Sequence, residues 1–196
     1  MRSCTTAPGQ GLPDGGASPR PYHGRMSPPD GPEQPFSDPA GTWNRRFSES
    51  GYLFGTEPND WLREHADLWH AGQRILCVAD GEGRNSVWLA QRALTVDAFD
   101  VSDVGVRKAR DFARITGVRV NFAVADVATL PWPESVYDGV VAIFIQFADP
   151  TLRARIFHGM VRSLKPGGIL LLQGYAPRQL EFRLAPAMEL QLRHGV

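Results

Sequence analysis

The sequence has 196 residues, a length that suits one domain with a hydrophobic core. Its 21 Lys and Arg residues balance 21 Asp and Glu residues, so it lacks the strong positive charge that is typical of nucleic-acid-binding proteins. No apolar run approaches the roughly 20 residues that cross a membrane, and residues near Met1 lack a signal-peptide core. The two cysteines, Cys4 and Cys77, are too few for a disulfide framework and favour a reducing cytoplasmic location.

Residues 1–40 differ in composition from the rest of the chain. They hold nine of the sixteen prolines and six of the 20 glycines, with few aliphatic side chains. Such a segment buries too little apolar surface to offset the entropy that is lost on ordering, so we expect a disordered leader. The alternative is a proline-rich ligand for a partner module, for which residues 19–21 supply the only fragment with a basic residue between prolines.

An aromatic-rich segment, residues 43–59, leads into a predicted helix at residues 61–70. Asn59 or Asp60 is a suitable N-cap for this helix. Its apolar side chains recur on one helical face, at Leu62, Ala66 and Trp69. The aromatic residues of the preceding segment are therefore expected to pack over one edge of the fold.

Beyond residue 74, apolar runs of strand length alternate with helical runs. Strands are predicted at residues 75–79, 96–99, 118–124, 137–145 and 169–173. Helices are predicted at residues 86–94, at 102–117 between Ser102 as N-cap and Gly117 as C-cap, and at 149–164, opened by Asp149. This alternation predicts an α/β fold: a doubly wound, mostly parallel sheet with right-handed crossovers.

The turn after the first predicted strand carries the first sign of a ligand site. Gly81 and Gly83 have no Cβ, so the backbone can turn sharply and a ligand can approach it closely. Asp100 ends the next strand, where its carboxylate can accept hydrogen bonds from the two hydroxyls of a ribose. Ser86 stands where a dinucleotide site has a third glycine, and no P-loop lysine follows. An oxidoreductase that uses a dinucleotide is therefore disfavoured, and an adenosine ligand without phosphates remains.

Seven short motifs follow one another between residues 43 and 175. They lie at residues 52–59, 81–86, 100–102, 125–127, 130–131, 137–141 and 164–168. In this order they resemble class I S-adenosylmethionine-dependent methyltransferases and, within them, the branch that includes the tellurite-resistance methyltransferases. Cys77 stands where the family's first motif has an acid, and Ala79 where it has its first glycine. The resemblance implies a methyltransferase domain at residues 41–175.

The resemblance also implies a site for S-adenosylmethionine. It implies a strand order of 3-2-1-4-5, with the cofactor at the switch point between the first and fourth strands. Asp100 and Val101 would hold the ribose, and Asp126 and Val127 would meet the adenine. The methionine part would lie along Ala79, Asp80, Gly81 and Gly83. Tyr52, Phe54 or Phe144 would face the sulfonium through cation–π contact, and the aromatic segment would then be a lid over the cofactor.

No residue stands out as a general base, and the catalytic residues stay unassigned. His65, His70 and His158 have no metal-ligand spacing and are expected to be surface or satisfied side chains. A thiolate or another chalcogen anion needs no base, so the expected reaction is methyl transfer to a small-molecule nucleophile of that kind. The alternative is a non-catalytic or truncated relative that keeps the fold and cofactor binding.

The carboxyl end departs from the family's pattern. The resemblance fades after Tyr175, and Pro186 interrupts the four-residue spacing of apolar residues in the short tail, residues 176–196. We expect the family's C-terminal hairpin of strands six and seven to be missing. The strand at residues 169–173 would then be an uncovered sheet edge, which invites self-association and lowers stability and catalysis.

Overall fold

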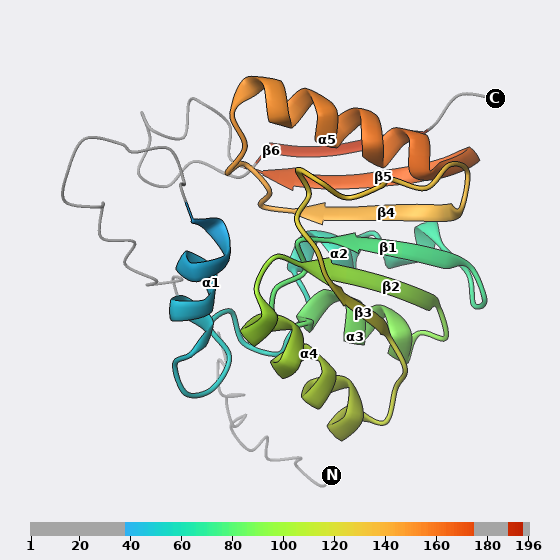
Figure 1. The fold of residues 1–196 in the computed structure, drawn as a ribbon. Helices are drawn as coiled ribbons and strands as arrows, with labels where there is room; N and C mark the ends of the chain where they lie inside the picture. The colour runs from blue at the N-terminus through green and yellow to red at the C-terminus, as the bar shows by residue number, and fades with distance from the viewer. Residues whose placement is uncertain (1–37, 175–187, 194–196) are drawn as a thin grey trace, which may run out of the picture. The chain divides into compact units, whose positions relative to one another are not determined.

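The computed structural model describes residues 38–174 and 188–193, whose strands form a six-stranded sheet in the order β3-β2-β1-β4-β5-β6 (Figure 1). The parallel strands are β1 (Arg74–Val78), β2 (Thr95–Asp100), β3 (Asn121–Val124), β4 (Tyr137–Ile143) and β5 (Leu164–Gly174). The helices are α1 (Pro39–Phe47), α2 (Asp60–Glu64), α3 (Arg84–Gln91), α4 (Asp103–Thr116) and α5 (Pro150–Ser163), with a 3-10 turn, η1 (Ala66–Leu68). The predicted doubly wound sheet with the order 3-2-1-4-5 is confirmed.

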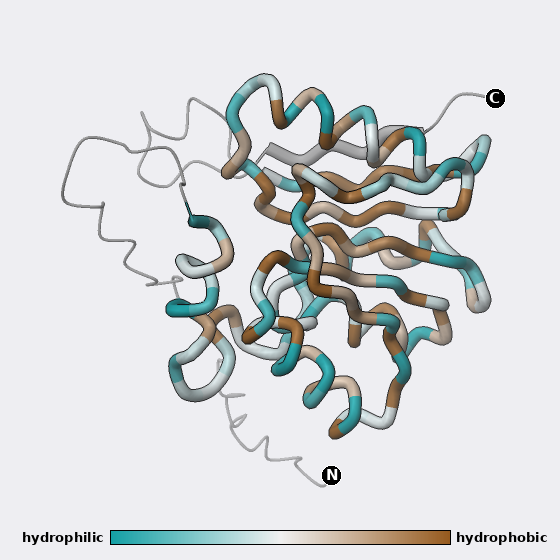
Figure 2. The backbone as a smooth tube through the Cα atoms, viewed as in Figure 1, coloured by the Kyte–Doolittle hydropathy of each residue, from teal (hydrophilic) through white to brown (hydrophobic). Residues whose placement is uncertain are grey.

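The central strands are mostly hydrophobic along their length (Figure 2), and their side chains are buried on both faces of the sheet. Ile75 and Cys77 of β1 belong to one buried cluster with residues of α2, α3 and α4. Leu76 and Val78 belong to the other, with residues of α5 and of the loop between β3 and β4. The two clusters fix β1 in the middle of the fold, with the turn that follows it at the edge of the sheet.

The helix ends follow the predicted capping residues. Asn59 Oδ1 accepts a hydrogen bond of 3.2 Å from the Leu62 N–H at the start of α2. Ser102 Oγ accepts one of 3.0 Å from the Gly105 N–H at the start of α4. Gly117 closes α4 with a φ of +76°, which glycine adopts without the steric cost of a Cβ. The caps of these two helices are therefore confirmed.

The predicted helix at residues 61–70 is shorter than expected. It ends at Glu64, and η1 follows it. Trp69 is then extended, with φ −128° and ψ 152°, and its buried indole lies where a Cβ on Gly139 of β4 would stand. The helix stops because this indole has to reach the sheet, which the helical spacing did not reveal.

The structure contains a helix, α1, in a segment for which no helix was predicted. Asp38 caps it by accepting a hydrogen bond of 2.8 Å from the Gly41 N–H, and Pro39 occupies its first turn. The ordered chain therefore starts at least two residues before the predicted boundary at residue 40. Residues 1–37, on which the predicted disorder falls, lie outside the described part of the chain.

The expectation that β5 is an uncovered edge was wrong. β6 (Met188–Arg193) pairs with it antiparallel, from Ile169 opposite Arg193 to Gly174 opposite Met188. Apolar and polar residues alternate along 188–193, which is the period of a strand, whereas the prediction had followed a helical spacing through the same residues. The described residues hold this single strand after β5, in agreement with the absence of a two-stranded hairpin. Residues 175–187, with Pro186, lie outside them.

Each helix in the described residues is too short or too polar to span a lipid bilayer.

Candidate functional site

The carboxyl ends of the parallel strands form one edge of the sheet. Gly81, Asp100, Asp126 and Phe144 lie at or just beyond the ends of β1, β2, β3 and β4, as predicted. β1 and β4 are hydrogen-bonded neighbours, and the chain leaves them on opposite faces of the sheet. This is the switch point at which doubly wound sheets form a ligand crevice.

Two of the four described non-glycine residues with a positive φ lie at the switch point, and the other two, Ala93 and Ser135, precede β2 and β4. Ala79 follows β1 with a φ of +51°, and Phe144 follows β4 with a φ of +57°. A left-handed conformation costs a residue with a Cβ about 1–2 kcal/mol. Strained residues of this kind cluster at ligand-binding edges, because the surrounding structure holds the backbone where a ligand needs it.

Asp100 ties the glycine turn to the loop after β2. Its side chain accepts hydrogen bonds from the Gly81 N–H at 2.9 Å on Oδ2 and from the Ser102 N–H at 2.8 Å on Oδ1. Burial raises the pKa of Asp100, and these N–H groups, with that of Val101, oppose the rise. A carboxylate has about four acceptor sites, so Asp100 keeps acceptor capacity beyond these N–H groups that a ribose hydroxyl can use.

Asp80 is the second carboxylate at this edge. Its N–H donates to the Phe99 carbonyl at 3.0 Å, and its carboxylate accepts a short hydrogen bond from Ser86 Oγ. Burial raises the pKa of Asp80 to about 7; the Ser86 hydroxyl opposes the rise, and the charge of Asp100 adds to it. Ser86, which replaces a third glycine, therefore holds this carboxylate. Two acids this close favour a positively charged group between them.

The two glycines of the turn are also required by packing within the protein. A Cβ on Gly81 would lie 3.1 Å from Cζ of Phe47, and one on Gly83 would lie 2.8 Å from Cβ of Ala109. Gly83 also starts α3 with a φ of +88°. The sequence analysis ascribed both glycines to the approach of a ligand, whereas the structure shows that α1 and α4 occupy part of that space.

Asp126 and Val127 follow β3 and form a turn. Asp126 Oδ1 accepts a hydrogen bond of 2.8 Å from the Ala128 N–H, which is the turn-forming role that aspartate often plays. The Ala125 N–H donates to the Asp100 carbonyl at 2.9 Å and so joins this turn to the loop after β2. Val127 is 7% exposed and lies in the buried core, so its side chain supports the turn from below.

The aromatic residues that were expected to form a lid over the cofactor pack in different places. The ring of Tyr52 lies 5.4 Å from that of Phe112 on α4, and burial together with nearby acids raises its pKa. Phe54 lies 6.4 Å from Phe47, whose ring covers Gly81. Phe144 is half-buried at the end of β4. Phe47 therefore lies against Gly81 of the glycine turn, with Phe122 near Gly83, and Tyr52 packs on α4.

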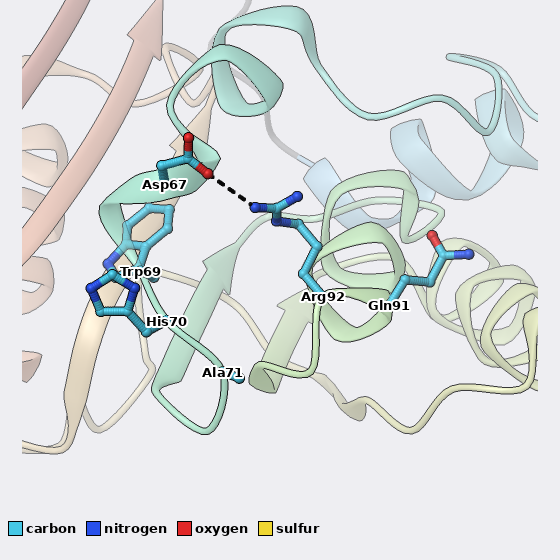
Figure 3. Close-up of a pocket in the computed structure, with 6 residues that line it drawn as sticks. All are labelled: Asp67, Trp69, His70, Ala71, Gln91 and Arg92. Atoms are coloured by element: carbon cyan, nitrogen blue, oxygen red, sulfur yellow. Dashed lines mark hydrogen bonds and ion pairs between the residues drawn. The ribbon is translucent and has the colours of Figure 1, made fainter.

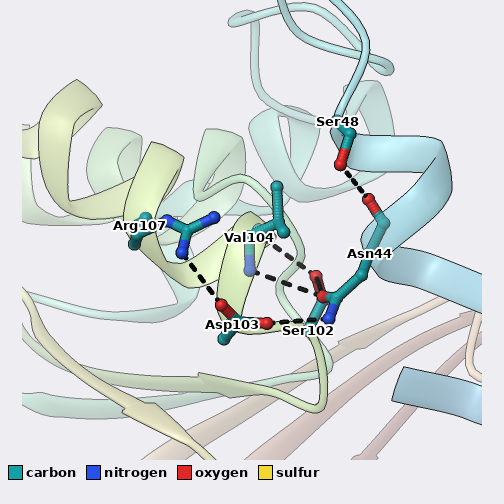
Figure 4. Close-up of polar contacts among 7 residues, drawn as sticks. Asn44, Ser48, Ser102, Asp103, Val104 and Arg107 are labelled. Carbon is teal, nitrogen blue, oxygen red and sulfur yellow. Dashed lines mark hydrogen bonds and ion pairs between the residues drawn. The ribbon is translucent and has the colours of Figure 1, made fainter. Parts of the chain in front are cut away.

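Helix α1 contributes a polar residue that the sequence analysis did not identify. Asn44 Nδ2 donates to Asp103 Oδ1 at 2.7 Å, and its Oδ1 accepts from Ser102 Oγ at 2.5 Å and from the Val104 N–H at 3.4 Å (Figure 4). These contacts fix α1 on the start of α4, beside Asp100. The sequence signalled aromatic cover in this region but gave no sign of this polar contact.

A hollow of about 600 Å³ lies near the opposite, amino end of β1 (Figure 3). It is lined by Asp67, Trp69, His70, Ala71, Gln91 and Arg92. Asp67 and Arg92 are paired there at 3.2 Å, both largely exposed. Residues 38–174 and 188–193 hold no group of three or more His, Cys, Asp or Glu side chains that could bind a metal ion. The carboxyl edge, with its strained backbone and paired acids, is the better candidate.

Comparison with known proteins shows similarity to methyltransferases. Residues 75–168 match the family model described as a methyltransferase domain. Methyltransferase GfsG of Streptomyces halstedii is 34% identical over 119 residues, which are 59% of this chain and 42% of GfsG. Demethylmenaquinone methyltransferase of Thermus thermophilus is 32% identical over 123 residues, 60% of this chain and 54% of that enzyme.

A solved structure named for a different activity is also similar. The crystal structure of the [4+2]-cyclase SpnF superposes with a TM-score of 0.51 at 30% identity, over 57% of this chain and 44% of that one. The chain spans about half the length of the curated relatives that it matches. The residues that match the family model, 75–168, include the glycine turn, Asp100, Asp126 and Phe144.

Proposed function

We propose that residues 75–168, which match the model of a methyltransferase domain, form a class I S-adenosylmethionine-dependent methyltransferase domain, and that this protein transfers a methyl group from S-adenosylmethionine to a small-molecule nucleophile. The observation that carries the proposal is the pair of carboxylates at the switch point. Asp100 keeps acceptor capacity for the ribose hydroxyls, and Asp80 with Gly81 lies where the charged methionine part would be held.

The residues would act mainly by holding the two reactants in line. Asp100 would bind the ribose, and the turn at Asp126 would bind the adenine. The backbone of Ala79, Asp80, Gly81 and Gly83 would hold the methionine part. Phe144 would border the reacting methyl group. The sulfonium supplies the activation when bound, so the protein's contribution is position and an environment that suits positive charge.

The narrower part of the proposal concerns the acceptor. A thiolate, or a selenium or tellurium anion, attacks without a base, and the motifs that resemble the tellurite-resistance branch support that choice. The similar demethylmenaquinone methyltransferase is named for another acceptor, so a phenolic or quinol acceptor belongs in the same assay. A cytoplasmic location, expected from the two cysteines, is part of the same proposal.

A second candidate is a relative that keeps the fold and the cofactor without methyl transfer. The similarity to the cyclase SpnF supports this candidate, because it shows that sequence likeness in this fold extends to a protein named for another reaction.

Two measurements decide between the candidates. Calorimetry with S-adenosylmethionine, S-adenosylhomocysteine and, as a control, NAD tests the cofactor. Transfer of labelled methyl groups to a thiol, selenite, tellurite and a hydroquinone tests the reaction. Binding with transfer supports the enzyme, binding without transfer to any acceptor supports the second candidate, and binding of NAD alone overturns both.

A further inference from the structure

The N-terminal arm, residues 38–59, lies over the carboxyl edge of the sheet, and the glycine-turn motif holds it there. Glu82, between the two glycines, accepts a hydrogen bond of 2.6 Å from the Leu53 N–H on Oε2. Arg84 donates to the Phe54 carbonyl at 3.2 Å. Asn85 Oδ1 accepts from the Asn59 N–H at 2.9 Å. Three of the four residues after Gly81 thus contact the arm through its backbone.

The centre of these contacts is a buried ion pair. Glu82 Oε1 pairs with Lys108 Nζ of α4, and the two side chains are only 4% and 23% exposed. Lys108 Nζ also donates to the Phe47 carbonyl at 2.9 Å and to the Glu49 carbonyl at 3.2 Å, and it lies 5.4 Å from the ring centroid of Tyr52. Glu82 and Lys108 both lie outside the arm, and their other hydrogen bonds are made with the backbone of the arm.

A buried ion pair is a weak source of stability, because desolvation of the two charges offsets most of their attraction. This pair does something that an apolar pair of similar volume could not do. It satisfies one N–H and two carbonyl groups of the arm between residues 47 and 53, which have no helix or sheet partner there. The pair therefore fixes the path of the arm over the glycine turn.

The arm covers the site that the proposed function requires. Phe47 is 2% exposed and lies against Gly81 and Gly105, where a Cβ would meet its ring at 3.1 and 3.0 Å. Asp100 beneath it is 6% exposed. A nucleoside that reaches this carboxylate has to displace the arm on entry, and the arm has to move again before it leaves.

We propose, on the basis of the proposed function, that Glu82 and Lys108 are positioning residues: they clamp the N-terminal arm over the cofactor crevice and set the rate at which the demethylated cofactor leaves. The pair touches the arm's backbone and not the reacting atoms. It therefore changes dissociation of the nucleoside and leaves the methyl transfer step itself unchanged.

The test compares four variants. Lys108→Met removes the donors to the arm, and Glu82→Ala removes the acceptor for the Leu53 N–H. The double variant Glu82→Gln with Lys108→Met is neutral, so it leaves no buried charge without a partner, yet it lacks the donors to Phe47 and Glu49. Arg114→Met is the matched control: it lies on the same helix, and its ion pair with Asp111 is exposed, at 73% and 64%.

Three quantities are measured on the full chain: the melting temperature, the rate of tryptic cleavage after Arg45 and Arg46 in α1, and the rate of S-adenosylhomocysteine dissociation by stopped-flow displacement. We expect Lys108→Met and Glu82→Ala to raise cleavage and dissociation about tenfold, the equivalent of one lost hydrogen bond to a charged group. The double variant recovers the melting temperature but not slow dissociation. A purely structural pair would recover both, which would overturn the proposal.

The outcomes also separate this proposal from the proposed function. If the wild type binds no S-adenosylhomocysteine, the proposed function fails. The clamp is then tested by the rate of tryptic cleavage of the arm without ligand, and equal cleavage rates for Lys108→Met and Arg114→Met overturn it. If the wild type binds and Lys108→Met dissociates as slowly as Arg114→Met, the proposed function stands and the clamp is wrong.

Discussion

The acidic side chains at the two ends of the parallel strands have different kinds of partner. At the amino end, Asp97 of β2 accepts a hydrogen bond of 2.9 Å from Arg74, and Asp138 of β4 pairs with Lys165 at 2.9 Å. At the carboxyl end, the hydrogen bonds to Asp80 and Asp100 come from a hydroxyl and from backbone N–H groups.

The difference appears in the pKa values. Burial opposes the charge of Asp138, but the Arg74 N–H and Lys165 outweigh it and lower its pKa. Burial raises the pKa of Asp80 and of Asp100. The acids at the amino end are thus paired with cationic groups of the protein and stabilise it. The carboxylates of Asp80 and Asp100 at the carboxyl end are instead available to a cationic ligand, at a cost in stability.

The largest expected effect is at the amino end. Asp97→Ala leaves the half-exposed Arg74 and the amide of Asn121 without their acceptor. We expect a loss of about 2 kcal/mol in the free energy of unfolding, less than for a fully buried pair because Arg74 is 46% exposed. This equals about 4–8 °C in melting temperature for a chain of this size.

The control for Asp97→Ala is Asp67→Ala, which breaks a pair with Arg92 in which Asp67 is fully exposed. Its melting temperature should stay within about 2 °C of the wild type. Cofactor affinity should be unchanged in both variants. Equal melting temperatures for the two would contradict a stabilising role for the amino end.

The matching change at the carboxyl end is Asp100→Ala. It removes a charged acceptor for two hydroxyl donors, and hydrogen bonds to charged groups contribute about 1.5–3 kcal/mol each. We expect the affinity for S-adenosylmethionine, measured by calorimetry, to fall at least about tenfold. The fold should persist, as judged by circular dichroism. Wild-type affinity in this variant would remove Asp100 from the site.

The pH dependence of stability should also differ between the acids at the two ends. Because the pKa of Asp80 is about 7 in the native state, against 3.8 unfolded, the native state holds a proton that the unfolded state has released. The free energy of unfolding therefore falls as the pH rises from about 4 to 7. Asp80→Asn should flatten this fall in melting temperature; an unchanged slope would show that another group titrates.

Asp138 should act in the opposite sense. Its pKa lies below 3.8, so its stabilising contribution is present above that pH and is lost as the pH falls through its native pKa. Asp138→Asn should therefore lower the melting temperature throughout the neutral range and keep the wild-type slope between about pH 4 and 7. A flattened slope in this variant would contradict the assignment of that slope to Asp80.

The smallest expected effect concerns the strained backbone at the carboxyl end. Ala79→Gly relieves the left-handed conformation, at φ +51°, but loosens the unfolded chain, so we expect a net gain of about 0.5 kcal/mol in the free energy of unfolding. Ala90→Gly, in the last turn of α3, should instead lose up to about 1 kcal/mol. Chemical denaturation measures both, and equal losses would show that residue 79 is unstrained.

Much of this fold could be predicted because its signals are local. Each of these signals depends on a few neighbouring residues, so it can be recognised in the sequence. Examples are the apolar runs of strand length, the cap at Ser102 and the closing glycine at residue 117. The carboxyl-end placement of Asp100 follows in the same way, since it needs only the end of a strand. The β6 pairing was misread because one short run fits a helical and a strand spacing at once.

Tertiary structure alone decided what the turn residues do. The sequence by itself determined the parallel sheet and the edge at which Gly81, Asp100 and Asp126 meet, because periodicity and strand ends fix those. It did not reveal that Ser86 holds Asp80 or that Phe47 covers Gly81. Nor did it reveal that Glu82 and Lys108 hold an arm that lies about 30 and about 60 residues from them in the sequence. Those contacts join distant segments, and a hydrogen bond or buried ion pair is set by distances that only the packed fold defines.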